Sequence, residues 1–271
     1  MAAASGQSQA FSNRKRLEPM ADRLFVVTGA SRGLGAAIAE QLLAPGHVLL
    51  CIARHRNDAL SAQAEARGAR CEQWALDLAQ PIEAADRLDA WLAALDGASF
   101  EAATLINNAA ALTRIGPIDD CSSVELANAL RVGLEAPLLL SAAFLRGTRA
   151  WRTDRRVLNI SSGLGRRAMA GQAAYCATKG GMDHLSRAMA LDEAARPNGA
   201  KIVSLAPGVI DTDMQLHLRV GDAAGFPEKA HFVGLKQNGQ LASASDAAAR
   251  VLAYLTRADF GANVTADVRD A

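Results

Sequence analysis

Short apolar runs alternate with longer amphipathic stretches along nearly the whole chain, and this alternation limits the possible folds more than any other feature. The short runs are typical of buried strands, and the longer stretches have the apolar spacing of helices. Strands that alternate with helices form βαβ units, whose right-handed crossovers place helices on both faces of a mostly parallel sheet. The sequence therefore predicts an α/β fold with a doubly wound parallel sheet.

The expected elements follow this alternation to the end of the chain. Strands are expected over residues 24–27, 47–53, 70–76, 103–106, 157–160, 201–205 and 262–268. Helices are expected over residues 36–43, 59–67, 82–95, 173–195 and 245–255, with a further long helix from about residue 122. Ser122 and Glu125 predict a capping box at the start of that long helix. Residues 207–242 carry several glycines and Pro227, so we expect irregular structure there and a mobile lid over residues 211–240.

The composition is that of a globular protein, because half of the 271 residues are apolar and 21% are charged. The 29 Lys and Arg residues against 28 Asp and Glu give a net charge of +1, which leaves no excess of cations for nucleic-acid phosphates. Uninterrupted apolar runs such as residues 136–140 are too short to cross a bilayer, so we expect no membrane. We expect a disordered N-terminal extension over residues 1–20. Since no linker interrupts the series of strands and helices that follows, we expect a single domain over residues 21–271.

The cysteines give no metal or disulfide pattern, since none forms a CxxC pair or lies beside a histidine at ligand spacing. They are Cys51, Cys71, Cys121 and Cys176. We expect reduced, mostly buried thiols, no metal site and a cytoplasmic protein. The basic residues 14–16 do not precede the apolar run of a secretory signal, so we interpret them as part of a solvated tail.

A glycine-rich turn over residues 28–35 (Thr-Gly-Ala-Ser-Arg-Gly-Leu-Gly) separates the first expected strand from the first expected helix. Glycine permits positive φ and a close approach of the backbone. The helix N-terminus offers free N–H groups and the positive end of a dipole to a pyrophosphate. Such a turn alone often uses glycine for steric reasons only, but its place in a βα series predicts a dinucleotide site.

The spacing of this turn, T-G-x-x-x-G-x-G, resembles that of the short-chain dehydrogenase/reductase family, and the resemblance covers roughly residues 22–268. Further motifs of the family occur in the same order: N-N-A-G with its last glycine replaced, a serine 13 residues before the tyrosine of Y-x-x-x-K, and a P-G turn. They are residues 107–110 (Asn-Asn-Ala-Ala), Ser162, Tyr175 with Lys179, and Pro207-Gly208. The resemblance implies a Rossmann-type sheet and a nicotinamide cofactor.

The end of the second expected strand indicates which dinucleotide binds. A carboxylate there suits the ribose 2′-hydroxyl of NAD, while a basic residue suits the phosphate of NADP. Ala53 occupies the expected acidic position, Arg54 follows it, and Arg32 adds a cation within the turn. Arginine is always charged and donates bidentately to phosphate, so we predict NADP(H). The alternative is that both arginines are solvated loop charges.

By the resemblance, the cofactor site extends from the turn over several loops. The implied residues are Gly29, Ser31, Arg32, Gly33, Leu34 and Gly35 in the turn, Arg54 at the NADP phosphate, Asp77 and Leu78 at the adenine, Asn107 on the adenosine side, Tyr175 and Lys179, Ile210 at the nicotinamide amide, and Thr212 at the pyrophosphate. Two alternatives stay open: Asp77 as a helix-start residue and Ile210 as a plain core residue.

Tyr175 and Lys179 are spaced i, i+4 in an expected helix, so both project from one face. A phenol with a pKa of about 10 exchanges protons poorly at neutral pH, but a nearby ammonium stabilises the phenolate and lowers that pKa. Ser162, at the end of an expected strand, can hydrogen-bond the substrate oxygen. The pattern predicts an NADPH-dependent carbonyl reductase of ketones, diketones or aldehydes, with hydride transfer to the carbonyl carbon.

One position departs from the family, whose fourth catalytic residue is an asparagine in the long helix. Gly133 occupies that position here, and a helical glycine costs about 1 kcal/mol relative to alanine unless the helix is kinked. Asn128 is a weak substitute, since it lies five residues upstream. The departure keeps a second hypothesis open, in which a catalytically weakened protein acts as a dinucleotide sensor or scaffold.

The substrate side is less specific. Residues 208–215 and 264–269 resemble a subgroup that contains sepiapterin and benzil reductases. By that resemblance Asp267 anchors substrate, and the alternative is a plain terminal strand. Arg166 and Arg167 follow the catalytic serine and either attract an anionic substrate or form a solvated loop pair.

Three apolar residues, Met214, Phe226 and Phe232, either line an apolar substrate pocket or pack into the core. Members of the family pair through two long helices. We therefore expect a homodimer or homotetramer with a small-molecule carbonyl or alcohol substrate.

Overall fold

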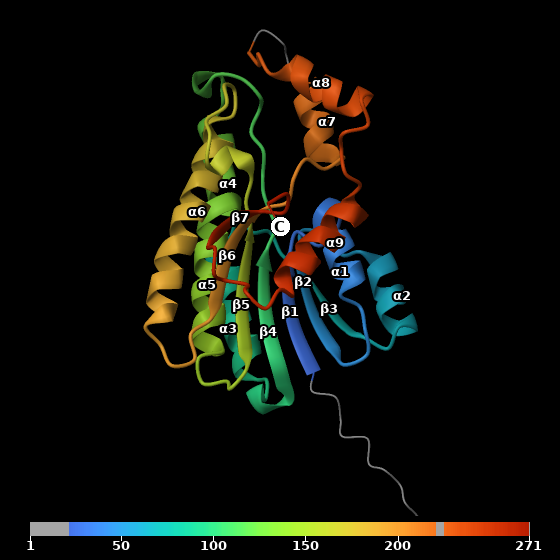
Figure 1. The fold of residues 1–271 in the computed structure, drawn as a ribbon, viewed down its shortest axis with the longest axis vertical. Helices are drawn as coiled ribbons and strands as arrows, with labels where there is room; N and C mark the ends of the chain where they lie inside the picture. Colours follow the sequence, from blue (N-terminus) through green and yellow to red (C-terminus); the bar gives the residue numbers. More distant parts are fainter. Residues whose placement is uncertain (1–21, 221–224, 271) are drawn as a thin grey trace, which may run out of the picture.

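A parallel sheet forms the centre of the computed structural model, which describes residues 22–220 and 225–270 (Figure 1). Within these residues the sheet has seven strands in the order β3-β2-β1-β4-β5-β6-β7, each parallel to its neighbours. The strands are β1 (Asp22–Thr28), β2 (His47–Ala53), β3 (Arg70–Ala75), β4 (Phe100–Asn107), β5 (Asp154–Ile160), β6 (Lys201–Ala206) and β7 (Thr265–Asp267). The α/β prediction is confirmed, while the expected extension over residues 1–20 lies outside the described residues.

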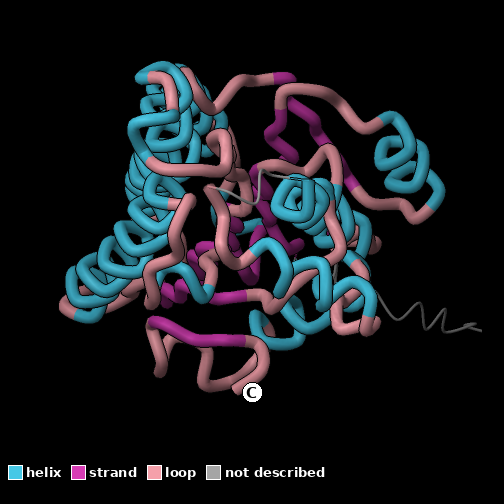
Figure 2. The backbone as a smooth tube through the Cα atoms, turned by 90° about the horizontal axis from the view of Figure 1, so that it is seen from above, coloured by secondary structure: helices cyan, strands magenta, loops and turns pink. Residues whose placement is uncertain are grey.

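Helices cover both faces of this sheet (Figures 1 and 2). They are α1 (Gly33–Gln41), α2 (Asp58–Ala66), α3 (Pro81–Ala93), α4 (Ser123–Leu130), α5 (Ala136–Gly147), α6 (Ala173–Ala194), α7 (Asp213–Val220), α8 (Lys229–Gln237) and α9 (Ala244–Leu255). Helices α1, α2 and α9 pack on one face and α3 and α5 on the other, while α6 packs against β6. At the top of Figure 1, α7 and α8 extend beyond the sheet.

Two cores result from the alternation of side chains along the central strands. In β1, Phe25 and Val27 pack into the core beneath α1 and α9, whereas Leu24 and Val26 pack into the core beneath α3 and α5. A strand that is buried on both faces reads as a continuous apolar run, which is why the sequence located the central strands.

Helices α4 and α5 are joined by a π-helical segment, Arg131–Glu135, into one helix of 25 residues. Its first turn has the expected capping box, in which Ser122 and Glu125 bond each other's backbone N–H groups. By length and mean hydropathy, 1.3, this helix alone among the described segments is long and apolar enough to cross a membrane. The fold uses it as a core helix, since Leu140 and Phe144 are fully buried beneath α3. The sequence prediction weighed only uninterrupted apolar runs and did not detect this property.

Two expectations are wrong in detail. The stretch after Pro207 is not irregular, because it contains α7 and α8. Pro227 lies two residues before α8 and Gly239, with a φ of +64°, two residues after it, while Gly234 lies within α8. The thiols are free, but only Cys51 is buried and the other three are partly exposed.

Candidate active site

The glycine-rich turn lies where the strand order of the sheet reverses, since β1 has β2 on one side and β4 on the other. Ligands of open α/β sheets bind in the crevice at the carboxyl ends of such strands. The Thr28 hydroxyl accepts hydrogen bonds from the backbone N–H groups of Asn108 (2.9 Å) and Ala109 (3.0 Å). The Asn108 amide donates to the Thr28 carbonyl at 3.0 Å. These bonds fix the end of β4 against the turn.

Glycine is required at two positions of the turn because of close backbone contacts. A Cβ on Gly35 would lie 2.2 Å from the Gly29 carbonyl oxygen, and Gly29 itself has a φ of +68°. Helix α1 then begins at Gly33, and no side chain caps its first N–H groups. Uncapped N–H groups at a helix N-terminus are the donors that a pyrophosphate accepts, so this turn fits a dinucleotide.

Several of the predicted cofactor residues surround this turn. Thr212 lies beside it, since its methyl carbon is 3.6 Å from the position of a Cβ on Gly33. Ser31 is half-buried within the turn, and the exposed Arg54 directly follows β2. Arg32 is exposed, and its guanidinium donates to Asp213 at the start of α7 at 2.8 Å.

Other predicted cofactor residues point elsewhere. Asn107 is buried and its amide group donates to Ser141 (3.1 Å) and Asn159 (2.8 Å), so these hydrogen bonds hold the side chain, and a contact with adenosine stays a prediction. Leu34 and Leu78 are buried in the two cores, which leaves their backbones as the only possible contacts.

Asp77 and Ile210, the two residues with open alternatives, both make local contacts within the protein. Asp77 accepts a hydrogen bond from the Ala79 N–H at 3.0 Å, in the turn before α3. Ile210 is half-buried against the core and pairs with Ala242 in an isolated bridge. A cofactor contact for either residue stays a prediction.

The predicted Ser–Tyr–Lys group is brought together at the end of β5. Ser162 follows β5, and Tyr175 and Lys179 share one face of α6. The Lys179 ammonium donates to the carbonyl of Ile160, the last residue of β5, at 2.7 Å and lies 5.6 Å from the centre of the Tyr175 ring. The three side chains therefore line one end of the crevice.

Burial dominates the titration of this group. It raises the pKa of Tyr175 to about 12, although a hydrogen bond with Ser162 acts in the opposite direction. It lowers the pKa of Lys179 to about 8, although the negative charge of Asp183 acts in the opposite direction. The expected lowering of the phenol pKa is thus not found: the phenol keeps its proton, and its chemistry is that of an acid.

The departure at Gly133 lies within the π-helical segment, which confirms that the helix is distorted there. Gly133 is buried, and a Cβ on it would lie 3.0 Å from the methyl carbon of Thr178, the residue before Lys179. The position therefore has little room for a side chain. Asn128 is half-buried in α4, and its substitute role stays a prediction.

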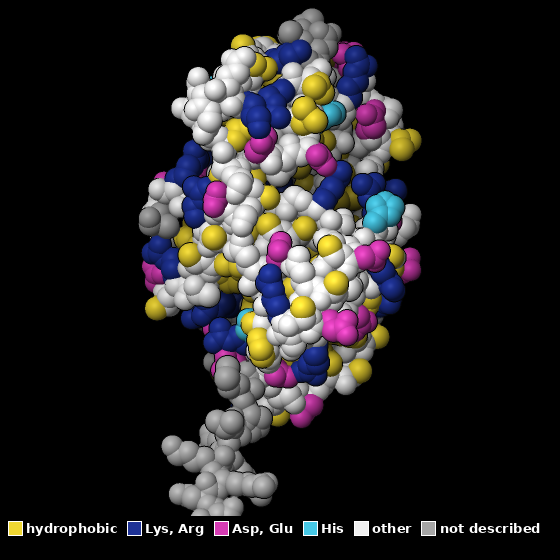
Figure 3. Space-filling view, turned by 90° about the vertical axis from the view of Figure 1, so that its right-hand side faces the viewer, with side chains coloured by type: hydrophobic (Ala, Val, Ile, Leu, Met, Phe, Trp, Pro, Cys, Tyr) yellow, Lys and Arg dark blue, Asp and Glu magenta, His cyan; other side chains and the backbone are white. Residues whose placement is uncertain are grey.

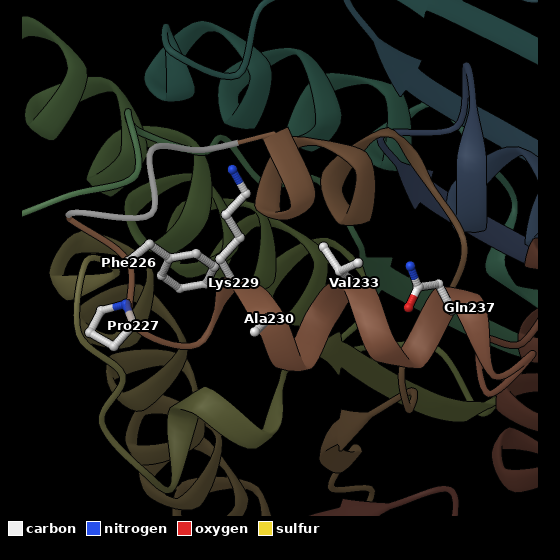
Figure 4. Close-up of a pocket in the computed structure, with 6 residues that line it drawn as sticks. All are labelled: Phe226, Pro227, Lys229, Ala230, Val233 and Gln237. Carbon is white, nitrogen blue, oxygen red and sulfur yellow. The ribbon is translucent and has the colours of Figure 1, made fainter.

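The two phenylalanines expected near the substrate belong to a small third core. Phe226 and Phe232 are buried and stacked, with ring centres 5.6 Å apart, and pack with Ile115 and Met169. Met214 is half-buried outside this cluster. A hollow of about 490 Å³ runs along α8, but no residue of the Ser–Tyr–Lys group lines it (Figure 4). Both phenylalanines pack into this third core, and Phe226 also lines the hollow, so a substrate contact of Phe226 stays a prediction.

The remaining substrate-side candidates are held by ionic contacts. Arg166 is not a solvated loop residue, because its side chain lies 3.3 Å from the Asp183 carboxylate and donates to the Ala266 carbonyl at 2.8 Å. Asp267 is buried, and Arg269 donates to both of its oxygens, at 2.8 and 2.6 Å. The carboxylate that was expected to anchor substrate is therefore already paired.

A dinucleotide-type turn at the switch point and a Ser–Tyr–Lys group beside it define a nicotinamide-dependent oxidoreductase of the Rossmann type. Comparison with known proteins names the family: residues 23–222 match the family model described as short chain dehydrogenase, and the chain belongs to this family.

Two curated relatives are benzil reductases described as (S)-benzoin forming. The protein from Bacillus cereus is 34% identical over 221 residues, which cover 82% of this chain and 89% of the relative. The protein from Bacillus subtilis is 31% identical over 234 residues, which cover 86% and 93%.

Solved structures agree with this assignment. A putative 2-deoxy-d-gluconate 3-dehydrogenase from Agrobacterium tumefaciens with bound NADP has a TM-score of 0.74 and 27% identity, and covers 92% of this chain and 95% of its own. Structures of this fold have been solved with NADP and with NAD. The chain is thus a short-chain oxidoreductase with a nicotinamide dinucleotide cofactor.

Proposed function

We propose that the protein is an NADPH-dependent carbonyl reductase of ketones, diketones or aldehydes. The observation that carries this proposal is the assembly of Ser162, Tyr175 and Lys179 at the end of β5, beside a turn that fits a dinucleotide. When bound, a nicotinamide supplies the hydride for the carbonyl carbon. The chain supplies the proton and the orientation of the substrate oxygen.

Each of the three side chains has a distinct role in this proposal. Tyr175 donates its hydroxyl proton to the substrate oxygen as the carbonyl carbon is reduced. The Ser162 hydroxyl hydrogen-bonds the same oxygen and stabilises the charge that develops there. Lys179 stabilises the phenolate that remains, because its ammonium lies beside the ring.

NADPH is the proposed cofactor because two arginines are available and a carboxylate is missing. Arg54 is exposed just past β2, Arg32 is exposed in the turn, and Ala53 stands where NAD enzymes of this type have an acidic residue. The ion pair of Arg32 with Asp213 is exposed and therefore easily exchanged for a phosphate.

The proposed substrates are aryl ketones and diketones, by analogy with the two benzil reductases. A test is NADPH oxidation with benzil, a set of other ketones and a set of aldehydes. Turnover of benzil with an (S)-benzoin product supports the proposal, and no turnover of any carbonyl substrate contradicts it.

The sharpest mutational test is Tyr175→Phe. We expect turnover to be lost, because the proton donor is removed, while the affinity for NADPH stays within a few-fold, since the ring still packs. Ala177→Ser, an exposed position on the same helix, is the matched control and should stay active. Activity of Tyr175→Phe close to that of the unmodified enzyme would show that another group protonates the substrate.

The sensor or scaffold alternative rests on Gly133, which removes one residue of the family's catalytic set. It predicts NADPH binding without turnover.

We also propose that the protein forms a homodimer or homotetramer in the cytoplasm, with no nucleic-acid or membrane partner. The free thiols and the mixture of both charge signs on the face in Figure 3 support this setting.

A further inference from the structure

A buried carboxylate that the proposed chemistry does not use lies behind the active site. Asp183 is 1% exposed and accepts hydrogen bonds from the hydroxyls of Ser161 and Ser204, both at 2.6 Å. Its second oxygen lies 3.3 Å from the Arg166 guanidinium. Sequence reasoning missed this cluster, although an aspartate four residues after Lys179 on a helix signals it.

The cluster joins the elements that carry the catalytic group. Ser161 directly precedes Ser162, Ser204 belongs to β6, and Asp183 lies one turn beyond Lys179 on α6. The 3-10 turn after Ser162 packs closely on this point, since a Cβ on Gly165 would lie 2.8 Å from the Asp183 carboxylate. A single side chain thus contacts β5, β6 and the loop of the catalytic serine.

We propose that Asp183 is a positioning residue of the reductase: it fixes the strand end that carries Ser162 and, through its negative charge, keeps the Lys179 ammonium cationic in its buried site. This inference rests on the proposed function. To accept hydrogen bonds from the Ser161 and Ser204 hydroxyls, a neutral side chain such as an amide would be enough at position 183. A buried charge is costly without a cationic partner, and two cations are near: the Arg166 guanidinium at 3.3 Å, and Lys179 one helical turn before Asp183 on α6.

Few other charges act on this point. Arg166 approaches from the loop after β5, and Asp267 with its partner Arg269 lies on and beyond β7. On α6 itself the titratable neighbours are Tyr175 and Cys176 before Lys179, and the exposed His184 and Arg187 beyond Asp183. Strand β6 presents only the Ser204 hydroxyl, and the charged Arg131 and Glu135 of the π-helical segment are exposed. Asp183 and Arg166 are therefore the charges whose removal acts on Lys179 most directly.

Two variants that should shift the pKa of Lys179 in opposite directions test the proposal. Asp183→Asn keeps an acceptor for both hydroxyls and removes the negative charge, so the pKa of Lys179 should fall by about one unit. Arg166→Gln removes the cation that offsets Asp183, so the same pKa should rise. In pH profiles of kcat, the basic limb should move to lower pH in the first variant and to higher pH in the second.

Direct titration of Lys179 separates this inference from the reductase proposal. The Cε signal of Lys179, identified by its loss in Lys179→Arg, is followed by NMR against pH in the protein without cofactor or substrate. Opposite shifts in Asp183→Asn and Arg166→Gln support the inference even if Tyr175→Phe remains active, which would contradict the reductase proposal alone.

A purely structural Asp183 gives a different result. Both variants would then lose thermal stability and activity, with the pKa of Lys179 and the basic limb unchanged or shifted in the same direction. Either result overturns the proposal. If Asp183→Asn does not fold, an unchanged Lys179 pKa in Arg166→Gln overturns it by itself.

Discussion

At the scale of single residues, burial decides what Tyr175 and Lys179 can do. A phenol with a pKa of about 12 is protonated at neutral pH, which is the form that can donate, although the raised pKa makes it a weaker acid than an ordinary phenol. The Lys179 ammonium, with a pKa of about 8, is still largely charged at neutral pH but loses its proton when the pH rises by one to two units. We therefore expect activity to fall as pH rises through 8, because Lys179 loses its positive charge there while Tyr175 stays protonated.

The preference for NADPH over NADH is also expected to depend on single residues. We expect NADPH to bind about tenfold tighter than NADH, a difference of about 1.4 kcal/mol, because Arg54 is free to contact the 2′-phosphate. Arg54→Asp should narrow or reverse the preference, and titration of both cofactors measures it. The neighbouring exposed Arg56, changed to Asp, is the control for a nonspecific charge effect. Equal affinities of the unmodified chain for the two cofactors would exclude a phosphate contact.

At the scale of elements, the π-helical segment explains how the chain accommodates Gly133. That segment packs against α6, where a Cβ on Gly133 would lie 3.0 Å from the Thr178 methyl carbon. The family's asparagine would need the space that the Thr178 methyl occupies. Positions 133 and 178 are therefore coupled, since a smaller residue at 178 would open the space for an amide at 133.

This coupling predicts a double variant. Gly133→Asn alone should lose stability, because its Cβ meets Thr178 at 3.0 Å. Combined with Thr178→Ala, it should raise kcat with KM nearly unchanged, since a transition-state interaction is added. Thr178→Ala alone is the control, and thermal unfolding is measured beside the kinetics. A stable double variant without a gain in kcat would mean that another group already completes the proton path.

At the scale of the whole molecule, the elements with strong local signals were predictable from sequence. The central strands are buried on both faces, and the Ser122 capping box marks a helix start. Helices α7 and α8 were missed because their flanking glycines and Pro227 were taken as signs of an irregular loop. Local pattern does not reveal that such residues end helices instead of preventing them.

The site was predictable where a motif fixes it and not where packing does. Ser162, Tyr175 and Lys179 meet as their spacing predicts, because each follows from the position of an element. The direction of a buried side chain does not follow in this way: Asn107 faces Ser141 and Asn159, while its neighbour Asn108 closes the turn. The bond of Arg166 to the Ala266 carbonyl likewise joins residues 100 positions apart, whereas the pairing of Asp267 with Arg269 is local and was missed although the two residues are near in sequence.

Unpaired apolar side chains on the long helices bear on the assembly of the molecule. Val124, Leu130 and Leu138 of α4 and α5 are 78%, 42% and 43% exposed, and Leu191 of α6 is 75% exposed. Helices α4 and α6 pack beside each other at one edge of the fold (Figure 1). Exposed apolar residues on adjacent helices are typical of a surface that another subunit covers.

The assembly prediction follows from this surface. Leu138→Glu should convert the expected dimer or tetramer into smaller species, because it places a charge in an interface between copies of the chain. Light scattering coupled to gel filtration measures the mass. Ile82→Glu on α3, equally apolar and 65% exposed but outside the proposed surface, is the control and should leave the mass unchanged. If the unmodified chain is monomeric at micromolar concentration, or if both variants keep its full mass, α4 and α5 do not form the interface, and their exposed leucines need a different partner.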